Sequence, residues 1–285
     1  MTTYVALGDS ITVGMGDPVP GAGRRWRGWP ALLAEGLREP SLYNLATAGA
    51  QTADVARDQL PRALALDPDI ASVVVGTNDT LRASFHPGRI AAAVAHTVGT
   101  LRDHGTVVLT MRLPDPGRMF GLPDSLARPL ARRIHQVNAV LDEVAASHRT
   151  LHFDAASDPA TYDRRMWAAD RLHPNERGHR RIACCFHDLL SADGYPVGPR
   201  PDPEPSNPPP TRRAEIAWLS TAGLLWLARR STDLVPYLLA MAIREWWSDT
   251  QPVPGAPRGS EPAVTVPELR DVMTPGAAVV TQPDR

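Results

Sequence analysis

Short runs of apolar residues alternate along the chain with longer stretches in which apolar side chains recur at helical spacing. The short runs predict strands at residues 4–7, 42–45, 70–75, 107–111 and 151–153. The longer stretches predict helices at residues 29–38, 52–65, 87–103, 125–147 and 175–190. Strands that alternate with helices are typical of an α/β fold with a mostly parallel sheet. We therefore expect a three-layer α/β/α sandwich, with functional residues beyond the carboxyl ends of its strands.

The alternating pattern ends near residue 195. Residues 196–210 are rich in proline, which predicts an extended linker. Residues 211–248 return to helical composition and predict a helical hairpin that breaks near Ser231. Residues 249–285 are rich in proline and glycine, so we expect a disordered tail. The predicted organisation is one α/β domain over residues 1–195, a linker, and a C-terminal helical segment with its tail.

The predicted hairpin is unusually rich in tryptophan. It holds four of the seven tryptophans of the chain, at positions 218, 226, 246 and 247. Leu219, Leu225 and Trp226 share one face at helical spacing, which indicates a surface made for burial. Docking onto the α/β domain or a second copy of the chain is one interpretation. Peripheral membrane contact is the other, because arginines flank the tryptophans.

Composition narrows the possible functions. Of the 285 residues, 43% are hydrophobic, which is enough for a sizeable core, and the net charge of -1 gives no overall attraction to nucleic acid. Every basic residue is an arginine, which excludes mechanisms that need a lysine, such as a P-loop or a Schiff base. The chain has no signal-peptide pattern and no apolar stretch of ~20 residues, so we expect a cytoplasmic protein without a transmembrane helix.

A serine follows the first predicted strand in the sequence Gly8-Asp9-Ser10-Ile11. This places Ser10 on a turn at a carboxyl strand end, where glycine permits a tight backbone path. By itself, a Gly-Asp-Ser triplet is ordinary in turns.

A carboxylate and a histidine stand close together near the end of the α/β pattern. Asp170 precedes His173 by three residues, so its carboxylate can reach around a turn and orient the imidazole. A histidine held in this way can take the proton of a serine hydroxyl, which is a weak nucleophile without a base. The alternative is structural, with Asp170 capping a turn and His173 packing on the next helix.

Two further segments follow predicted strands and carry hydrogen-bond donors. They contain Gly49 and Asn78, which are expected at the same end of the sheet as Ser10. A glycine amide and an asparagine side chain are suitable donors to the oxyanion that forms when serine attacks an acyl carbon. Each of them alone is also common in ordinary loops.

In the chain order Ser10, Gly49, Asn78 and His173, these four segments resemble the four blocks of the SGNH hydrolase superfamily, also called the GDSL esterases and lipases. The resemblance covers residues 4 to about 190 and implies a flavodoxin-like sandwich. It implies Ser10 as nucleophile, His173 as general base and Asp170 as the group that orients it. It also implies an oxyanion hole formed by the backbone amides of Ser10 and Gly49 and the side chain of Asn78.

The predicted reaction is hydrolysis of a carboxylic ester through an acyl-serine, with no metal or organic cofactor. An acyltransferase or thioesterase that uses the same site remains an alternative, as does a scaffold protein that acts through the C-terminal helices. The chain has no Gly-x-Ser-x-Gly elbow and no His-Glu-x-x-His motif, which disfavours an ordinary α/β-hydrolase and a zinc protease.

Substrate contacts are harder to predict. Trp26 and Arg27 lie in a glycine- and proline-rich loop after Ser10 and are candidates for a pocket wall or an anionic subsite. Solvated arginines are the alternative for this loop. Phe120 lies in the segment 114–129, which is either an apolar lip over the site or a packed surface loop.

Overall fold

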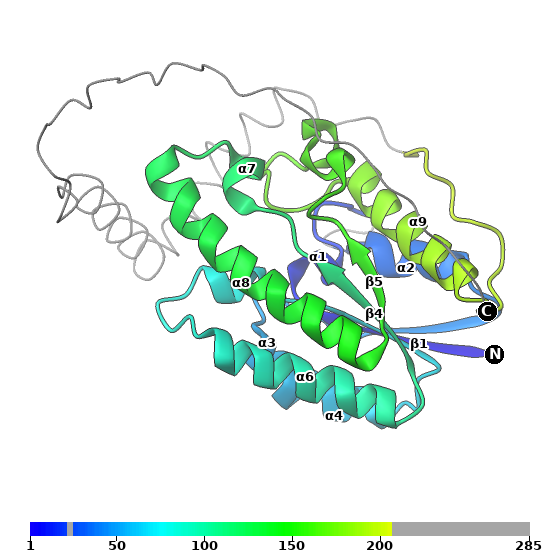
Figure 1. Cartoon of the computed structure of the whole chain (residues 1–285). Helices are drawn as coiled ribbons and strands as arrows, with labels where there is room; N and C mark the ends of the chain where they lie inside the picture. Colours follow the sequence, from blue (N-terminus) through cyan, green and yellow to red (C-terminus); the bar gives the residue numbers. More distant parts are fainter. Residues whose placement is uncertain (22–24, 207–285) are drawn as a thin grey trace, which may run out of the picture. The chain divides into compact units, whose positions relative to one another are not determined.

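The computed structural model describes residues 1–21 and 25–206 of the chain. Its centre is a five-stranded parallel sheet in the order β2-β1-β3-β4-β5 (Figure 1). The strands are β1 (Thr2–Gly8), β2 (Pro40–Asn44), β3 (Ile70–Val74), β4 (Val107–Arg112) and β5 (Leu151–Asp154). All five predicted strands are confirmed, with ends that move by one or two residues.

Helices cover both faces of this sheet. One face carries α2 (Gly28–Glu35) and α9 (Glu176–Ala192), which pack against each other. The opposite face carries α4 (Leu60–Leu64), α6 (Pro87–Asp103) and α8 (Asp124–His148) (Figure 1). Short helices at strand ends complete the fold: α1 (Ser10–Val13), α3 (Thr52–Asp54), α5 (Thr77–Thr80) and α7 (Pro116–Phe120). The predicted three-layer α/β/α sandwich is confirmed.

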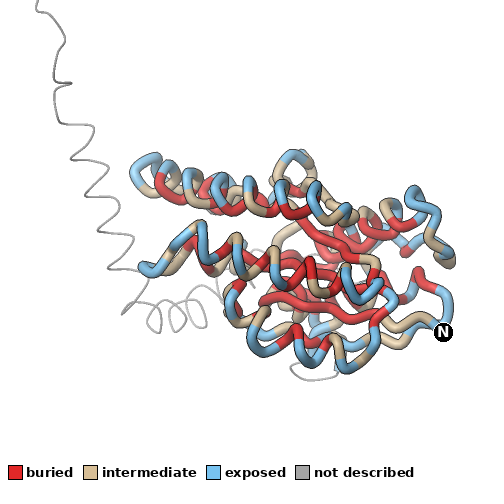
Figure 2. Tube along the Cα trace, turned by 60° about the horizontal axis from the view of Figure 1, so that its bottom comes forward, coloured by how far each residue is buried: buried red, intermediate tan, exposed pale blue. Residues whose placement is uncertain are grey.

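The core lies between the sheet and the inner faces of the helices (Figure 2). β3 is buried along its whole length, as expected for a central strand covered by helices on both sides. On the α2 and α9 face, the Trp29 ring packs on Phe186 with centroids 5.1 Å apart, and Phe153 meets Phe186 edge-on. These aromatic contacts join α2, α9 and β5 around one apolar centre.

The helix predicted at residues 52–65 is interrupted. Its middle, Val55–Gln59, forms a turn of π-helix between α3 and α4. Pro61 contributes to this break, because it stands at the start of α4 and has no backbone N–H to continue an α-helical ladder. Periodicity alone does not distinguish a π-helical turn from an α-helix.

The proline-rich segment after residue 195 packs on the domain. Residues 196–206 run beside α9 (Figure 1), where Arg180 donates to the backbone carbonyl of Asp202 and the hydroxyl of Ser206. Cys184 donates to the carbonyl of Pro201. The described part of the predicted linker is therefore fastened to the domain instead of spanning solvent.

The predicted helical hairpin at 211–248 and the tail at 249–285 lie outside the described residues. Among the helices of the described part, none is long and apolar enough to cross a lipid bilayer.

Candidate active site

The candidate site lies where the strand order changes direction. β2 lies on one side of β1 and β3 on the other, so a crevice opens between the carboxyl ends of β1 and β3. Ser10 follows β1, and Asn78 follows β3. In parallel α/β sheets, this position is the usual place for a ligand or substrate.

The turn that carries Ser10 is fixed from both sides. Gly8 has φ of 152°, and a Cβ there would lie 2.2 Å from the carbonyl oxygen of Val74, so only glycine fits. The side chain of Gln59 accepts from the Gly8 N–H at 2.8 Å and donates to its carbonyl at 2.9 Å. Gln59 comes from the π-helical turn, and its role was not predicted from the sequence.

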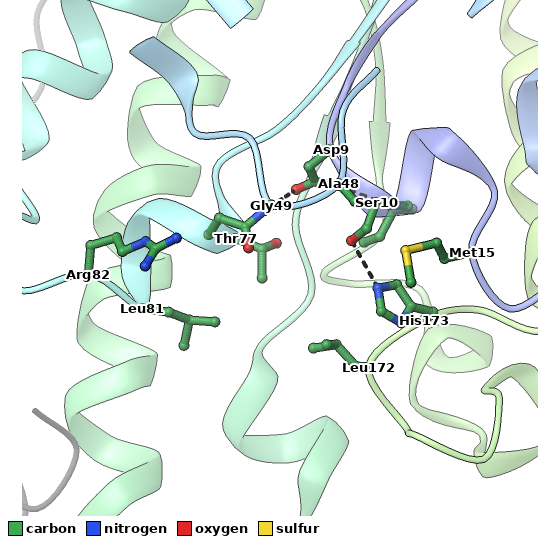
Figure 3. A pocket seen from close by; sticks show the side chains of 12 residues that line it. Asp9, Ser10, Met15, Ala48, Gly49, Thr77, Leu81, Arg82, Leu172 and His173 are labelled. Atoms are coloured by element: carbon green, nitrogen blue, oxygen red, sulfur yellow. Dashed lines mark hydrogen bonds between the residues drawn. The ribbon is translucent and has the colours of Figure 1, made fainter. Parts of the chain in front are cut away.

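Ser10, His173 and Asp170 form a continuous chain of hydrogen bonds. The Oγ of Ser10 lies 2.9 Å from Nε2 of His173 (Figure 3). On the other side of the ring, Nδ1 of His173 lies 2.7 Å from Oδ2 of Asp170. Because an ionised carboxylate only accepts, Nδ1 carries the imidazole proton and Nε2 of the neutral ring accepts from Ser10. The structure thus brings together the three residues that the sequence singled out.

Asp170 is held in its ionised form. Burial alone would raise the pKa of Asp170, but the hydrogen bond and charge of His173 and the backbone amides of His173 and Leu172 outweigh it, so the pKa is lowered. Oδ1 of Asp170 accepts from those two amides at 3.0 and 2.9 Å. The carboxylate therefore both shapes the turn and orients the imidazole.

Asn78 is held by two acceptors. Its Nδ2 donates to Oδ2 of Asp9 and to the carbonyl of Ala50, each at 3.1 Å. Both N–H bonds of this amide thus already have partners, and a third acceptor would have to share or displace one of them.

Burial raises the pKa of Asp9 to about 6, although the Ile11 amide, the charge of His173 and the Asn78 side chain each lower it.

A second buried carboxylate joins the segments around Gly49 and Asn78. Asp79 accepts from the backbone N–H of Thr52 at 3.1 Å and from its hydroxyl at 2.8 Å. Burial raises the pKa of Asp79, while its bonds to Thr52 lower it in part. Gly49, at φ of 83°, lies on the segment that this contact fixes beside Asn78.

A pocket of about 230 Å³ lies beside Ser10 and is also lined by Asp9, Gly49, Asn78 and His173. In Figure 3, Ser10 and His173 lie on one side of it, and Thr77, Leu81 and Arg82 lie opposite. The lining includes apolar side chains that the sequence did not single out: Ile11, Met15, Ala48, Leu81 and Leu172. Ile11, Ala48 and Leu172 are chain neighbours of Ser10, Gly49 and His173. Met15 and Leu81 reach the pocket through the packing of separate segments, which the hydrophobic pattern does not reveal.

Among the residues that the structure describes, neither Trp26 nor Arg27 lines this pocket, so these two predicted substrate contacts are not supported. The guanidinium of Arg27 forms two hydrogen bonds to Asp17, at 3.0 and 3.2 Å, and one to Glu176 at 2.7 Å. Trp26 is 38% exposed and pairs with Pro18 in an isolated antiparallel bridge. Phe120 ends α7, and its side chain lies outside the described part of the structure.

The fold is thus a parallel α/β sandwich with a serine-lined pocket at the switch point of its sheet. The chain belongs to the GDSL-like lipase/acylhydrolase family, which it matches over residues 6–181. This match confirms the resemblance found in the sequence and makes the chain a hydrolase of carboxylic esters. A search of curated proteins finds no match.

Solved structures share the fold. A lipase/acylhydrolase from Enterococcus faecalis is 20% identical with a TM-score of 0.54, and the match covers 72% of this chain and all of that one (100%). An acetylxylan esterase from Geobacillus stearothermophilus is 19% identical with a TM-score of 0.52, over 66% of this chain and 94% of the other. The esterase EstA from Pseudoalteromonas sp. is 18% identical with a TM-score of 0.51, and the match covers 69% of this chain and 100% of the other. At these identities, the likeness is one of fold.

Proposed function

We propose that this chain is a serine esterase that cleaves small carboxylic esters through an acyl-serine at Ser10. The observation that carries the proposal is the chain of hydrogen bonds from Asp170 through His173 to the Ser10 hydroxyl, which ends at the wall of a pocket. A serine hydroxyl needs a base to act as a nucleophile, and His173 is in position to be that base.

In the first half of the reaction, Oγ of Ser10 attacks the acyl carbon while its proton moves to Nε2 of His173. The C–O bond to the leaving alcohol then breaks, and the imidazolium returns the proton to the alkoxide. In the second half, His173 takes a proton from water as the water oxygen attacks the acyl carbon. The bond between that carbon and Oγ of Ser10 then breaks, the imidazolium returns the proton to Oγ, and the carboxylic acid leaves. Asp170 stabilises the imidazolium at each stage and itself stays ionised.

The negative charge that develops on the carbonyl oxygen needs donors. The backbone amide of Ser10 begins α1, where the first N–H groups of a helix have no acceptor within the helix. We assign the other two donors to the amide of Gly49 and the side chain of Asn78. Asn78 would give up or share its bond to Ala50 or Asp9 as the oxyanion forms.

The pocket favours a short acyl group. Its volume of about 230 Å³ lies below the range of roughly 300–1,000 Å³ typical of sites for drug-sized ligands. Ile11, Leu81 and Leu172 give it apolar walls, which suit an acetyl to butyryl chain. Acetylated sugars belong in the test panel because one structural neighbour is an acetylxylan esterase.

The test is a series of p-nitrophenyl esters from acetyl to palmitoyl, together with an acetylated xylo-oligosaccharide. We expect kcat/KM to be highest for the short esters, and a fluorophosphonate probe to label Ser10 as seen by peptide mass spectrometry. Added alcohols and acyl thioesters distinguish hydrolysis from acyl transfer and thioesterase activity. If no ester of the panel is cleaved and the probe labels no serine, the proposal is wrong.

A further inference from the structure

Ser10 and His173 are in contact although they are 163 residues apart in the chain. The sheet by itself does not bring them together. Two strands, β3 and β4, separate β1 from β5, which corresponds to roughly 14 Å at the usual strand spacing. His173 lies on the irregular segment after β5, so other contacts must hold that segment over the end of β1.

Arg27 joins the segments that carry the two residues. It binds Asp17, which lies seven positions after Ser10, through two hydrogen bonds, and it binds Glu176, three positions after His173, at 2.7 Å. The Asp17 side chain is fully buried, and the Glu176 side chain is only 7% exposed. A planar guanidinium that binds one carboxylate in a fork and a second at its end sets both separation and orientation.

Glu176 is anchored from two more directions. Its Oε1 accepts from Nε of Arg180 at 2.9 Å and from the backbone N–H of Ser206 at 2.7 Å. Two carboxylates, Asp17 and Glu176, thus face two guanidiniums in a largely buried cluster. Because opposite charges are present in equal number, their attraction offsets the free-energy cost of burying each one.

Two neutral contacts tie the same segments together. His179 accepts from the backbone N–H of Trp29 at Nδ1 and donates from Nε2 to the carbonyl of Met15 at 3.0 Å. Gly16 packs so tightly on the histidine segment that a Cβ there would lie 2.0 Å from the carbonyl oxygen of Pro174. Burial of the His179 ring lowers its pKa to about 4, which fits a ring that must stay neutral to accept at Nδ1.

We propose that Arg27 and Glu176 are positioning residues that set the distance between the Ser10 hydroxyl and the His173 imidazole. This inference rests on the proposed function and gives Arg27 a different role from the substrate contact predicted by the sequence. Misplacing reacting groups by ~1 Å can lower turnover by about 10²-fold. Loss of the Arg27 bridge should therefore reduce kcat and leave substrate affinity in place.

The experiment compares Arg27→Met with Arg27→Lys, and Glu176→Ala with Glu176→Gln, in the full chain. Arg27→Met is expected to lower kcat for a short ester by about 10- to 100-fold with KM within about twofold. Arg27→Lys keeps the charge but loses the fork, and Glu176→Gln keeps an acceptor oxygen, so each should recover part of the rate. Arg200→Met is the matched control, because it removes an ion pair with Asp188 on the exposed side of α9 and should leave kcat unchanged.

A crystal structure of Arg27→Met supplies a readout that does not depend on activity. We expect Oγ of Ser10 and Nε2 of His173 to move beyond hydrogen-bond distance in it. An unchanged distance, or a rise in KM at constant kcat, would overturn the positioning role, and the latter would restore Arg27 as a substrate contact. If Arg27→Met does not fold, the kcat and structure of the two conservative variants decide in the same way. Failure of the proposed function itself would show separately, as ester hydrolysis that survives Ser10→Ala.

Discussion

The candidate active site has two halves that the fold fixes in different ways. Ser10, Gly49 and Asn78 follow the neighbouring strands β1, β2 and β3, so backbone hydrogen bonds of the sheet set their relative positions. Asp170 and His173 lie on the irregular segment between β5 and α9. Side chains position this second half through the contacts of Arg27, His179 and Glu176.

The difference indicates how each half should respond to substitution. The sheet half is rigid because many cooperative backbone bonds define it, and its buried carboxylates Asp9 and Asp79 add local contacts. The segment with His173 lies outside the sheet and is tied to the segment after Ser10 by the side chains of Arg27 and His179, so loss of the Arg27 bridge is expected to change the geometry. Substitutions in the two halves should therefore separate effects on chemistry from effects on alignment.

The largest effect is expected for Ser10→Ala in the sheet half. Removing the nucleophile of a serine triad costs up to about 10⁶-fold in turnover. The substitution removes the hydrogen bond between the Ser10 hydroxyl and His173. The loss of this one bond at the pocket wall should change the melting temperature of the protein little. Steady-state rates on p-nitrophenyl acetate, with thermal melts as the folding control, check this. Activity within tenfold of the original chain would exclude Ser10 as the nucleophile.

In the histidine half, Asp170→Asn should lower kcat by about 10⁴-fold. An asparagine amide can donate to Nδ1 of His173 and so favour the tautomer that leaves Nε2 protonated and unable to accept from Ser10. Turnover at saturating ester measures the loss. A defect smaller than about tenfold would mean that the turn and its neighbours fix the imidazole without the charge of Asp170.

Asn78→Ala tests the oxyanion donor of the sheet half. We expect kcat to fall by about 10²- to 10³-fold with little change in KM, because the bond forms mainly in the transition state. Asp9→Asn is a useful partner variant, since Asp9 holds the Asn78 amide. A rise in KM alone would identify Asn78 as a ground-state contact.

The smallest effect concerns acid stability and His179. Burial lowers the folded-state pKa of His179 from 6.5 to about 4. As the pH falls below 6.5, the histidine binds a proton in the unfolded chain but not in the folded chain. The contribution of His179 to the free energy of unfolding is therefore fully present above pH 6.5 and decreases toward pH 4. At pH 5 the loss is about 2 kcal/mol. Asp9, with a raised folded-state pKa, acts in the opposite direction over this range.

Urea unfolding of the original chain and of His179→Gln at pH 7 and pH 5 isolates this contribution. The difference between the two chains should shrink at pH 5, because only the original loses the histidine contribution. His104→Gln is the control, since that ring is partly exposed and pairs with the exposed Asp67. An equal difference at both pH values would contradict the low pKa of His179.

The sequence was enough to predict the sheet half and the identity of the histidine pair. Ser10, Gly49 and Asn78 follow apolar runs that are strands, and parallel strands bring their carboxyl ends to one edge. Asp170 and His173 were found because their contact is local, over three residues. Contacts between distant segments were not predicted: Arg27 with Glu176 spans 149 residues, and neither residue carries a local pattern that indicates the other.

The number of residues in the π-helical turn at Val55–Gln59 determines whether Gln59 faces Gly8 beside the active site. Each residue of an α-helix advances by about 100° around the axis, so deletion of one residue in this turn would rotate α3 and α4 relative to each other by about that angle. If α3 kept its packing against α6, Gln59 would turn away from Gly8. Homologous chains that share this serine turn should therefore keep the same number of residues here, even where the residues themselves differ.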